Sequence, residues 1–257
     1  MSVAYPAGSV PAVSAGIFDD LVAEQDRLDG ILAGIGADGW ASASGAAGWS
    51  VTDVVLHLAQ TEEAVVASVT GGDALSGGPI EAGTLDDVMD RLVRAQRAAP
   101  AEVFQRWRTA RRAAVIALRQ ADPGTRLPWA AAPLSPAALA TTRLAEHWAH
   151  GLDITGPLGI PFPDTDRLRH VAWLGHRSLP YAFALAGREP HEVYCELVAP
   201  DGGTWRYGPA DADSAIRGRA GAFCRVGAQR LRPETSELAT TGPHAQAALQ
   251  VLRNYAG

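Results

Sequence analysis

The chain has 257 residues, of which 47% are hydrophobic and 19% are charged, and its formal net charge is -6. These values are typical of a folded globular protein and exclude an intrinsically disordered chain. The acidic balance offers no basic face for nucleic acid, and no apolar run reaches the length of a membrane span.

The first part of the chain predicts an arm followed by two helices. Residues 1–15 are rich in Pro, Gly and Ser and lack the pattern of a signal peptide, so we expect a disordered or extended arm. Apolar residues at helical spacing predict amphipathic helices over 17–36 and 51–70. Ser50 is a good N-cap for the second helix, and a small-residue loop separates the two.

Three more helices are predicted in the middle of the chain, over 85–99, 101–121 and 136–154. Pro100 breaks or kinks the run between the first two of them. The third begins with Ser135 at the N-cap and a proline at the first helical position, which is a strong start signal.

The pattern changes toward the end of the chain. Residues 166–187 predict a sixth helix with a kink at Pro180. After Pro190, apolar and polar residues alternate on either side of an Asp-Gly-Gly turn, which predicts a β-hairpin. The remaining predicted elements are the hairpin strands at 193–200 and 204–209, a strand at 214–220, and short helices at 220–231 and 243–256. This tail is predicted to be a small α+β unit.

Clustered arginines and the two cysteines receive structural interpretations. The arginines of the 101–121 helix have Ala and Val neighbours, which indicates a solvated helix face. They are Arg106, Arg108, Arg111 and Arg112. Cys195 and Cys224 lie in apolar runs without metal-ligand spacing, so we expect buried thiols in a reducing cytoplasm.

One group of residues has the spacing expected of a metal site. Glu146 and His150 are four residues apart, so they project from one helix face and can hold a single ion. His57 lies in an apolar helical context, where an imidazole without a partner is costly to bury. A carboxylate with two imidazoles suits zinc, iron(II), nickel or manganese and leaves coordination positions open. The alternative is a satisfied core histidine and a surface glutamate.

Neighbouring polar residues have supporting roles in this hypothesis. His147 points about 100° away from Glu146 around the helix, so it is not expected to be a ligand. Asp153 follows His150 by three residues and Asp53 precedes His57 by one turn, so each is a candidate acceptor that orients a ligand imidazole. For Asp53 the alternative is capping of the first helical turn.

The sequence around these residues resembles a known family. The segments GWSVTDVVLHLAQTEEAV (48–65) and TRLAEHWAHGLDITGPLG (142–159) are similar to motifs of the mycothiol-dependent maleylpyruvate isomerases, which belong to the DinB-like metal-binding bundles. The resemblance implies an α+β protein with a four-helix bundle over 16–160 and a sterol-carrier-like α+β domain over 161–257. It also implies that His57, Glu146 and His150 bind zinc.

The resemblance further implies a reaction. We expect thiol-assisted isomerisation or thiol transfer on a small electrophilic substrate, with mycothiol as a cofactor, in a monomer or homodimer. Arg225 and Arg230 are the counterparts of an arginine that binds the anionic substrate or the thiol near the metal. A tailoring enzyme of secondary metabolism that uses zinc, Ni2+ or Fe2+ without a thiol is one alternative. A zinc sensor or ligand carrier is another, although a sensor usually adds a fourth ligand, often Cys.

Overall fold

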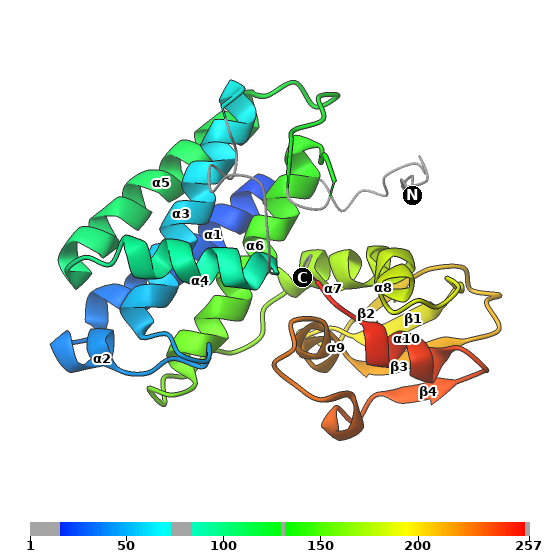
Figure 1. Cartoon of the computed structure of the whole chain (residues 1–257). Helices are drawn as coiled ribbons and strands as arrows, with labels where there is room; N and C mark the ends of the chain where they lie inside the picture. Colours follow the sequence, from blue (N-terminus) through cyan, green and yellow to red (C-terminus); the bar gives the residue numbers. More distant parts are fainter. Residues whose placement is uncertain (1–15, 73–83, 130–131, 255–257) are drawn as a thin grey trace. The chain divides into compact units, whose positions relative to one another are not determined.

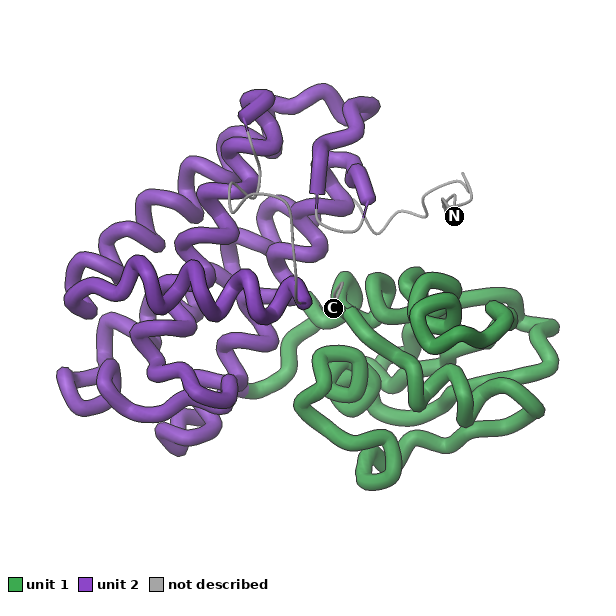
Figure 2. Tube along the Cα trace, viewed as in Figure 1, with its two compact units in different colours: residues 1–16, 163–255 green, residues 17–162, 256–257 purple. Residues whose placement is uncertain are grey.

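A computed structural model describes residues 16–72, 84–129 and 132–254 of the chain. The predicted arm over 1–15 therefore lies outside the described residues. The chain divides into two compact units, residues 17–162 and residues 163–255 (Figure 2). Within the described ranges, no helix combines the length and the apolar character that a membrane crossing requires.

Among the described residues of the first unit, the named elements are all helices (Figure 1). Its helices are α1 (Ile17–Gly34), α2 (Ala37–Ala41), α3 (Val51–Thr70), α4 (Leu85–Ala95), α5 (Pro100–Gln120) and α6 (Pro136–Thr155). The long helices α1, α3, α5 and α6 form a bundle in which α3 packs along α5 and α1 packs along α6. Helices α3 and α6 run in opposite directions, which brings the start of one beside the end of the other (Figure 1).

The predicted start signals are confirmed in this bundle. Ser50 and Asp53 form a reciprocal capping box at the start of α3, and Ser135 accepts a hydrogen bond from the Ala138 amide at the start of α6. Pro100 occupies the first turn of α5, where its missing N–H costs nothing. The short helix α2 was not predicted, because five residues are too few to show a helical period.

The bundle contains a cluster of buried apolar side chains, among which Trp107 and Leu56 are fully buried. The interpretation of the α5 arginines as a solvated face is wrong for Arg111, which is 5% exposed. Its guanidinium donates hydrogen bonds to Asp26 and Asp29 of α1 at 2.8 Å each. This arginine is buried because two carboxylates from the neighbouring helix neutralise its charge.

The second unit combines helices with a small mixed sheet. Its helices are α7 (Leu168–Arg177), α8 (Leu179–Leu185), α9 (Ala220–Gly227), a 3-10 turn (Pro233–Thr235) and α10 (Ala245–Val251). Its strands are β1 (Tyr194–Val198), β2 (Thr204–Tyr207), β3 (Ala215–Arg219) and β4 (Ala239–Thr241), in the order β2-β1-β3-β4. The hairpin β1–β2 is confirmed, whereas β4 was not predicted. The helix predicted over 166–187 with a kink at Pro180 is instead two helices, α7 and α8, with Pro180 in the first turn of α8.

The sheet buries one of its faces. Cys195 and Ile216 are direct partners in the parallel pairing of β1 with β3, and both are fully buried together with Leu197. Cys224 of α9 is fully buried too, so the interpretation of both cysteines as buried thiols is confirmed. Burial raises the pKa of Cys195 to about 12, so this thiol stays protonated at neutral pH. The predicted α+β fold class is confirmed.

Candidate metal centre

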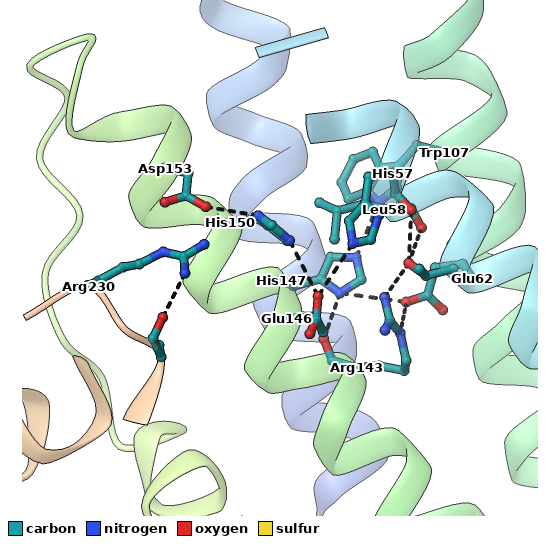
Figure 3. Close-up of polar contacts among 12 residues, drawn as sticks. His57, Leu58, Glu62, Trp107, Arg143, Glu146, His147, His150, Asp153 and Arg230 are labelled. Atoms are coloured by element: carbon teal, nitrogen blue, oxygen red, sulfur yellow. Dashed lines mark hydrogen bonds and ion pairs between the residues drawn. The ribbon is translucent and has the colours of Figure 1, made fainter. Parts of the chain in front are cut away.

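Two helices of the first unit bring the three predicted ligand residues together (Figure 3). His57 comes from α3, whereas Glu146 and His150 come from α6. The Oε2 atom of Glu146 lies 3.6 Å from Nε2 of His57 and 3.4 Å from Nε2 of His150. One donor atom from each of the three residues lies within 4.8 Å of the others.

These separations match the donor spacing around an ion better than direct hydrogen bonding. Good N–H···O bonds are about 2.7–3.2 Å long, which is shorter than either contact of Glu146. Zinc bonds of about 2.1 Å at a tetrahedral angle place two donor atoms about 3.4 Å apart. The residues present therefore fit a divalent transition metal in both donor type and spacing.

The three candidate ligands His57, Glu146 and His150, which we call the triad, differ in charge. Burial raises the pKa of Glu146, but the close contacts with His150 and His57 outweigh it and bring that pKa well below its usual range. Burial lowers the pKa of His57, so its ring is neutral. Burial opposes protonation of His150 as well, but Asp153 and Glu146 together raise its pKa to about 8. In the metal-free protein at neutral pH, His150 carries the proton that a metal would displace.

Asp153 fixes the orientation of the His150 ring. Its Oδ2 atom lies 2.9 Å from Nδ1 of His150, which leaves Nε2 directed toward Glu146. The backbone of Gly45 also lies close to Asp153, and its amide donates to the Asp153 carbonyl at 2.7 Å. A Cβ atom at position 45 would lie 3.0 Å from Oδ1 and 3.1 Å from Cα of Asp153. Any larger residue at position 45 would therefore press against Asp153.

The loop before α3 also covers His57. The ring of Trp49 lies 5.2 Å from the ring of His57, and its indole N–H donates to Asp90 of α4 at 2.9 Å. Nδ1 of His57 is buried and has no hydrogen-bond partner among the described residues. The aromatic contact with Trp49 and the contact with Glu146 therefore hold this ring.

Asp53 does not orient His57, which corrects one of the two roles considered for it. Its Oδ2 atom accepts hydrogen bonds from the amide and hydroxyl of Ser50, and its carboxylate receives both arms of the Arg97 guanidinium. Within the described ranges, neither carboxylate oxygen has a hydrogen bond to His57. Asp53 caps α3, and Arg97 lowers its pKa against the effect of burial.

His147 is directed away from the triad, as predicted from its position on the helix. The indole N–H of Trp107 donates to Nε2 of His147 at 3.2 Å, so this nitrogen is an acceptor. Nδ1 then carries the hydrogen and donates to the carbonyl of Arg143 at 2.8 Å. Burial, together with the charge of Arg143, lowers the pKa of His147 to about 3. His147 is a neutral structural residue with both nitrogens satisfied.

A buried ion pair beneath the triad was not predicted. The Arg143 side chain of α6 is 3% exposed and donates from Nε to Oε1 of Glu62 on α3 at 2.9 Å. Its Nη2 donates to the hydroxyl of Thr61 at 2.6 Å. The motif that contains Glu146 also contains Arg143, but nothing in the sequence pairs Arg143 with a glutamate 81 residues away.

The two predicted arginines lie in the second unit. Arg225 of α9 forms a two-armed ion pair with Asp164, with both contacts at 2.8 Å. Arg230 lies beyond the end of α9 and donates to the carbonyl of Ala228 at 2.7 Å. The helix predicted over 220–231 is therefore shorter than expected. The substrate-binding role that the resemblance implies for these arginines stays a prediction.

Comparisons with known proteins agree with the resemblance seen in the sequence. A family profile described as the mycothiol maleylpyruvate isomerase N-terminal domain matches residues 21–155. Two proteins of Mycobacterium tuberculosis, the uncharacterized proteins MT0041 and Rv0036c, are each 36% identical to the chain, over 93% of it and 94% of their own length.

Two solved structures share the fold. They are crystal structures of a mycothiol-dependent maleylpyruvate isomerase and of its histidine-to-alanine mutant. The TM-scores are 0.59 and 0.60 at 12% and 11% identity, over 90% of this chain and 96% of theirs. The profile and the fold lead to one conclusion: the chain belongs to the mycothiol-dependent maleylpyruvate isomerase family.

Proposed function

We propose that the chain is a metal-dependent enzyme that holds one divalent transition metal ion, zinc by expectation, through His57, Glu146 and His150. The observation that carries this proposal is the spacing of the three donors, with Glu146 Oε2 3.6 Å and 3.4 Å from the two imidazole nitrogens. Three protein donors leave coordination positions for a thiol or a substrate, which favours an enzyme over a closed regulatory site.

Each of the three side chains would contribute a different donor to the ion. His57 offers a neutral ring, Glu146 offers a charged carboxylate, and His150 offers Nε2 because Asp153 holds its Nδ1. When bound, the ion supplies Lewis acidity that lowers the pKa of a thiol or stabilises negative charge on a substrate oxygen. Glu146 contributes one negative charge, so the ion and its three ligands keep a net charge of +1 to attract anions.

The proposed reaction is thiol-assisted isomerisation or thiol transfer on a small electrophile, with mycothiol as the thiol. In isomerisation, the thiolate sulfur forms a C–S bond to one carbon of a cis double bond conjugated to a carbonyl. The π electrons then move onto the carbonyl oxygen as an enolate, and the remaining single bond rotates. When the enolate collapses, the C–S bond breaks and releases the thiolate and the trans product. The names of the two structural neighbours support this choice of thiol and reaction.

The test combines a metal assay with a thiol panel. The purified protein is loaded with zinc and assayed for isomerisation of maleylpyruvate with mycothiol, with glutathione and without thiol. We expect activity with mycothiol that disappears after chelation and in the variant His57→Ala. Activity that is equal with and without thiol would contradict the thiol part of the proposal. A protein that binds no zinc would contradict the metal part.

A further inference from the structure

A second polar layer lies one helical turn away from the metal triad, on the same two helices. Thr61 follows His57 by four residues on α3, and Arg143 precedes Glu146 by three residues on α6. Residues at these spacings share a helix face, and α3 and α6 are antiparallel (Figure 1). Thr61 and Arg143 are therefore displaced from the triad in the same direction.

Arg143 joins the two helices through a fork of hydrogen bonds (Figure 3). Its Nε donates to Glu62 at 2.9 Å and its Nη2 donates to Thr61 at 2.6 Å, so one planar group contacts two successive residues of α3. The side chains of Arg143 and Glu62 are 3% and 0% exposed. At this burial, water does not screen the pair, and breaking it would leave an uncompensated charge in the core.

The fork is connected to a ligand of the triad through the backbone. The Thr61 hydroxyl accepts from Arg143, and its hydrogen is shared between the carbonyls of His57 at 3.0 Å and Leu58 at 3.1 Å. Hydrogen bonds thus run from Arg143 of α6 through Thr61 to the backbone of α3 at His57 and Leu58. The donors of the triad come from both helices, so a shift of one helix along the other changes their separation directly.

Resting on the proposed metal function, we propose that Arg143 is a positioning residue that sets the register of α3 against α6, and thereby the distance from His57 to Glu146 and His150. A lysine cannot replace it, because an ammonium group lacks the planar fork that reaches Glu62 and Thr61 together. Removal of the fork weakens metal binding although no ligand is lost.

The test compares three variants of the full chain in zinc competition against a chromophoric chelator. We expect Arg143→Lys to bind zinc about 10–100-fold more weakly than the wild type, as for other residues that support metal ligands. Thr61→Val removes only the hydroxyl and should weaken binding in the same direction by a smaller factor. Arg108→Lys is the matched control, since Arg108 forms a similar fork onto Asp29 that joins α5 to α1.

Absorption of bound Co2+ separates positioning from general stability. A change in ligand geometry alters the d–d bands of the Co2+ protein in Arg143→Lys and Thr61→Val, but leaves them unchanged in Arg108→Lys. If Arg143→Lys does not fold, Thr61→Val decides alone. Wild-type affinity and an unaltered Co2+ spectrum in the folded variants would overturn this inference only. A wild-type protein that binds no metal would overturn the proposed function as well.

Discussion

Two histidines on one helix, three residues apart, have opposite environments. His147 and His150 are 0% and 8% exposed, so burial alone does not distinguish them. Both ring nitrogens of His147 are used by neutral partners, the indole of Trp107 and the carbonyl of Arg143. Oε1 of Glu62 lies 3.6 Å from Nδ1 of His147, but this nitrogen donates to the nearer carbonyl of Arg143. His150 instead has Asp153 at 2.9 Å from Nδ1 and Glu146 at 3.4 Å from Nε2.

This difference separates a histidine that holds the fold from one that can hold a ligand. Neutral partners fix one tautomer of His147, so its ring has no free lone pair, while burial and the charge of Arg143 lower its pKa to about 3. Carboxylates raise the pKa of His150 to about 8 and leave Nε2 with a proton that a metal can replace. The group that each ring nitrogen contacts most closely, rather than the burial of the ring, distinguishes the two histidines.

The largest effect is expected when one ligand of the triad is removed. Replacing His57 or His150 with Ala removes one of three protein donors, so we expect zinc content to fall from about one ion per chain to less than about 0.1. Elemental analysis after dialysis measures this content. Stoichiometric zinc in either variant would show that the ligands lie elsewhere.

The variant His147→Ala tests the structural role assigned to His147. It leaves the indole N–H of Trp107 and the carbonyl of Arg143 without their partner and opens a cavity in the core, so we expect a loss of about 2–5 kcal/mol in the free energy of unfolding. Urea denaturation measures the loss. The folded variant should still bind one zinc ion, and loss of zinc without loss of stability would reverse the assignments of the two histidines.

Asp153→Asn weakens the support of His150 without removing it. The amide oxygen can still accept from Nδ1, but the negative charge that favours donation by the ring is gone. We expect zinc affinity to fall about tenfold, measured by chelator competition. Asp122→Asn in an exposed turn is the control for loss of one charge, and it should bind zinc like the wild type.

The pKa of His150 predicts a pH dependence that differs between metal-free and zinc-loaded protein. Its folded pKa of about 8 lies above the unfolded value of about 6.5, so the native state binds more protons between them. The stabilisation from His150 is complete below pH about 6.5 and is lost as the pH rises through about 8, by about 2 kcal/mol at most. Zinc replaces this proton, so the zinc-loaded protein should not show the fall.

Urea denaturation at pH of about 6.5, 7.5 and 8.5 checks this prediction with and without a chelator. The variant His150→Gln has no titrating group at this position, so its metal-free stability should stay level across the same window. An equal fall in the wild type and in His150→Gln would assign the pH dependence to another group.

The smallest expected effect comes from removing the second unit. All three donors, Asp153 and the fork of Arg143 lie within residues 17–162. We therefore expect a fragment of these residues to fold and to bind zinc within about twofold of the full chain, since its ligands and their supports are retained. Circular dichroism and chelator competition measure both properties. An insoluble fragment would indicate that the two units share one core.

The sequence predicted those parts of the protein that depend on local spacing. Ser50, Pro100 and Ser135 marked helix starts because capping and proline geometry act within one turn. Glu146 and His150 could be paired because they are one turn apart, and the same geometry directed His147 elsewhere. Placing His57 beside them required a long-range contact, which the resemblance to a family supplied.

The missed features depend on contacts between distant segments. Arg143 meets Glu62 across 81 residues, and Arg111 is buried only because α1 supplies Asp26 and Asp29. Short elements such as α2 and β4 contain too few residues to show a period. No spacing rule predicts such partners, because folding of the whole bundle brings them together.

Zinc-edge anomalous diffraction from crystals of the zinc-loaded protein tests the central claim most directly. A single peak is expected at about 2.0–2.2 Å from Nε2 of His57, Nε2 of His150 and a carboxylate oxygen of Glu146. At full zinc occupancy, a peak bound by other residues, or one that omits His57, would contradict a metal centre shared by α3 and α6.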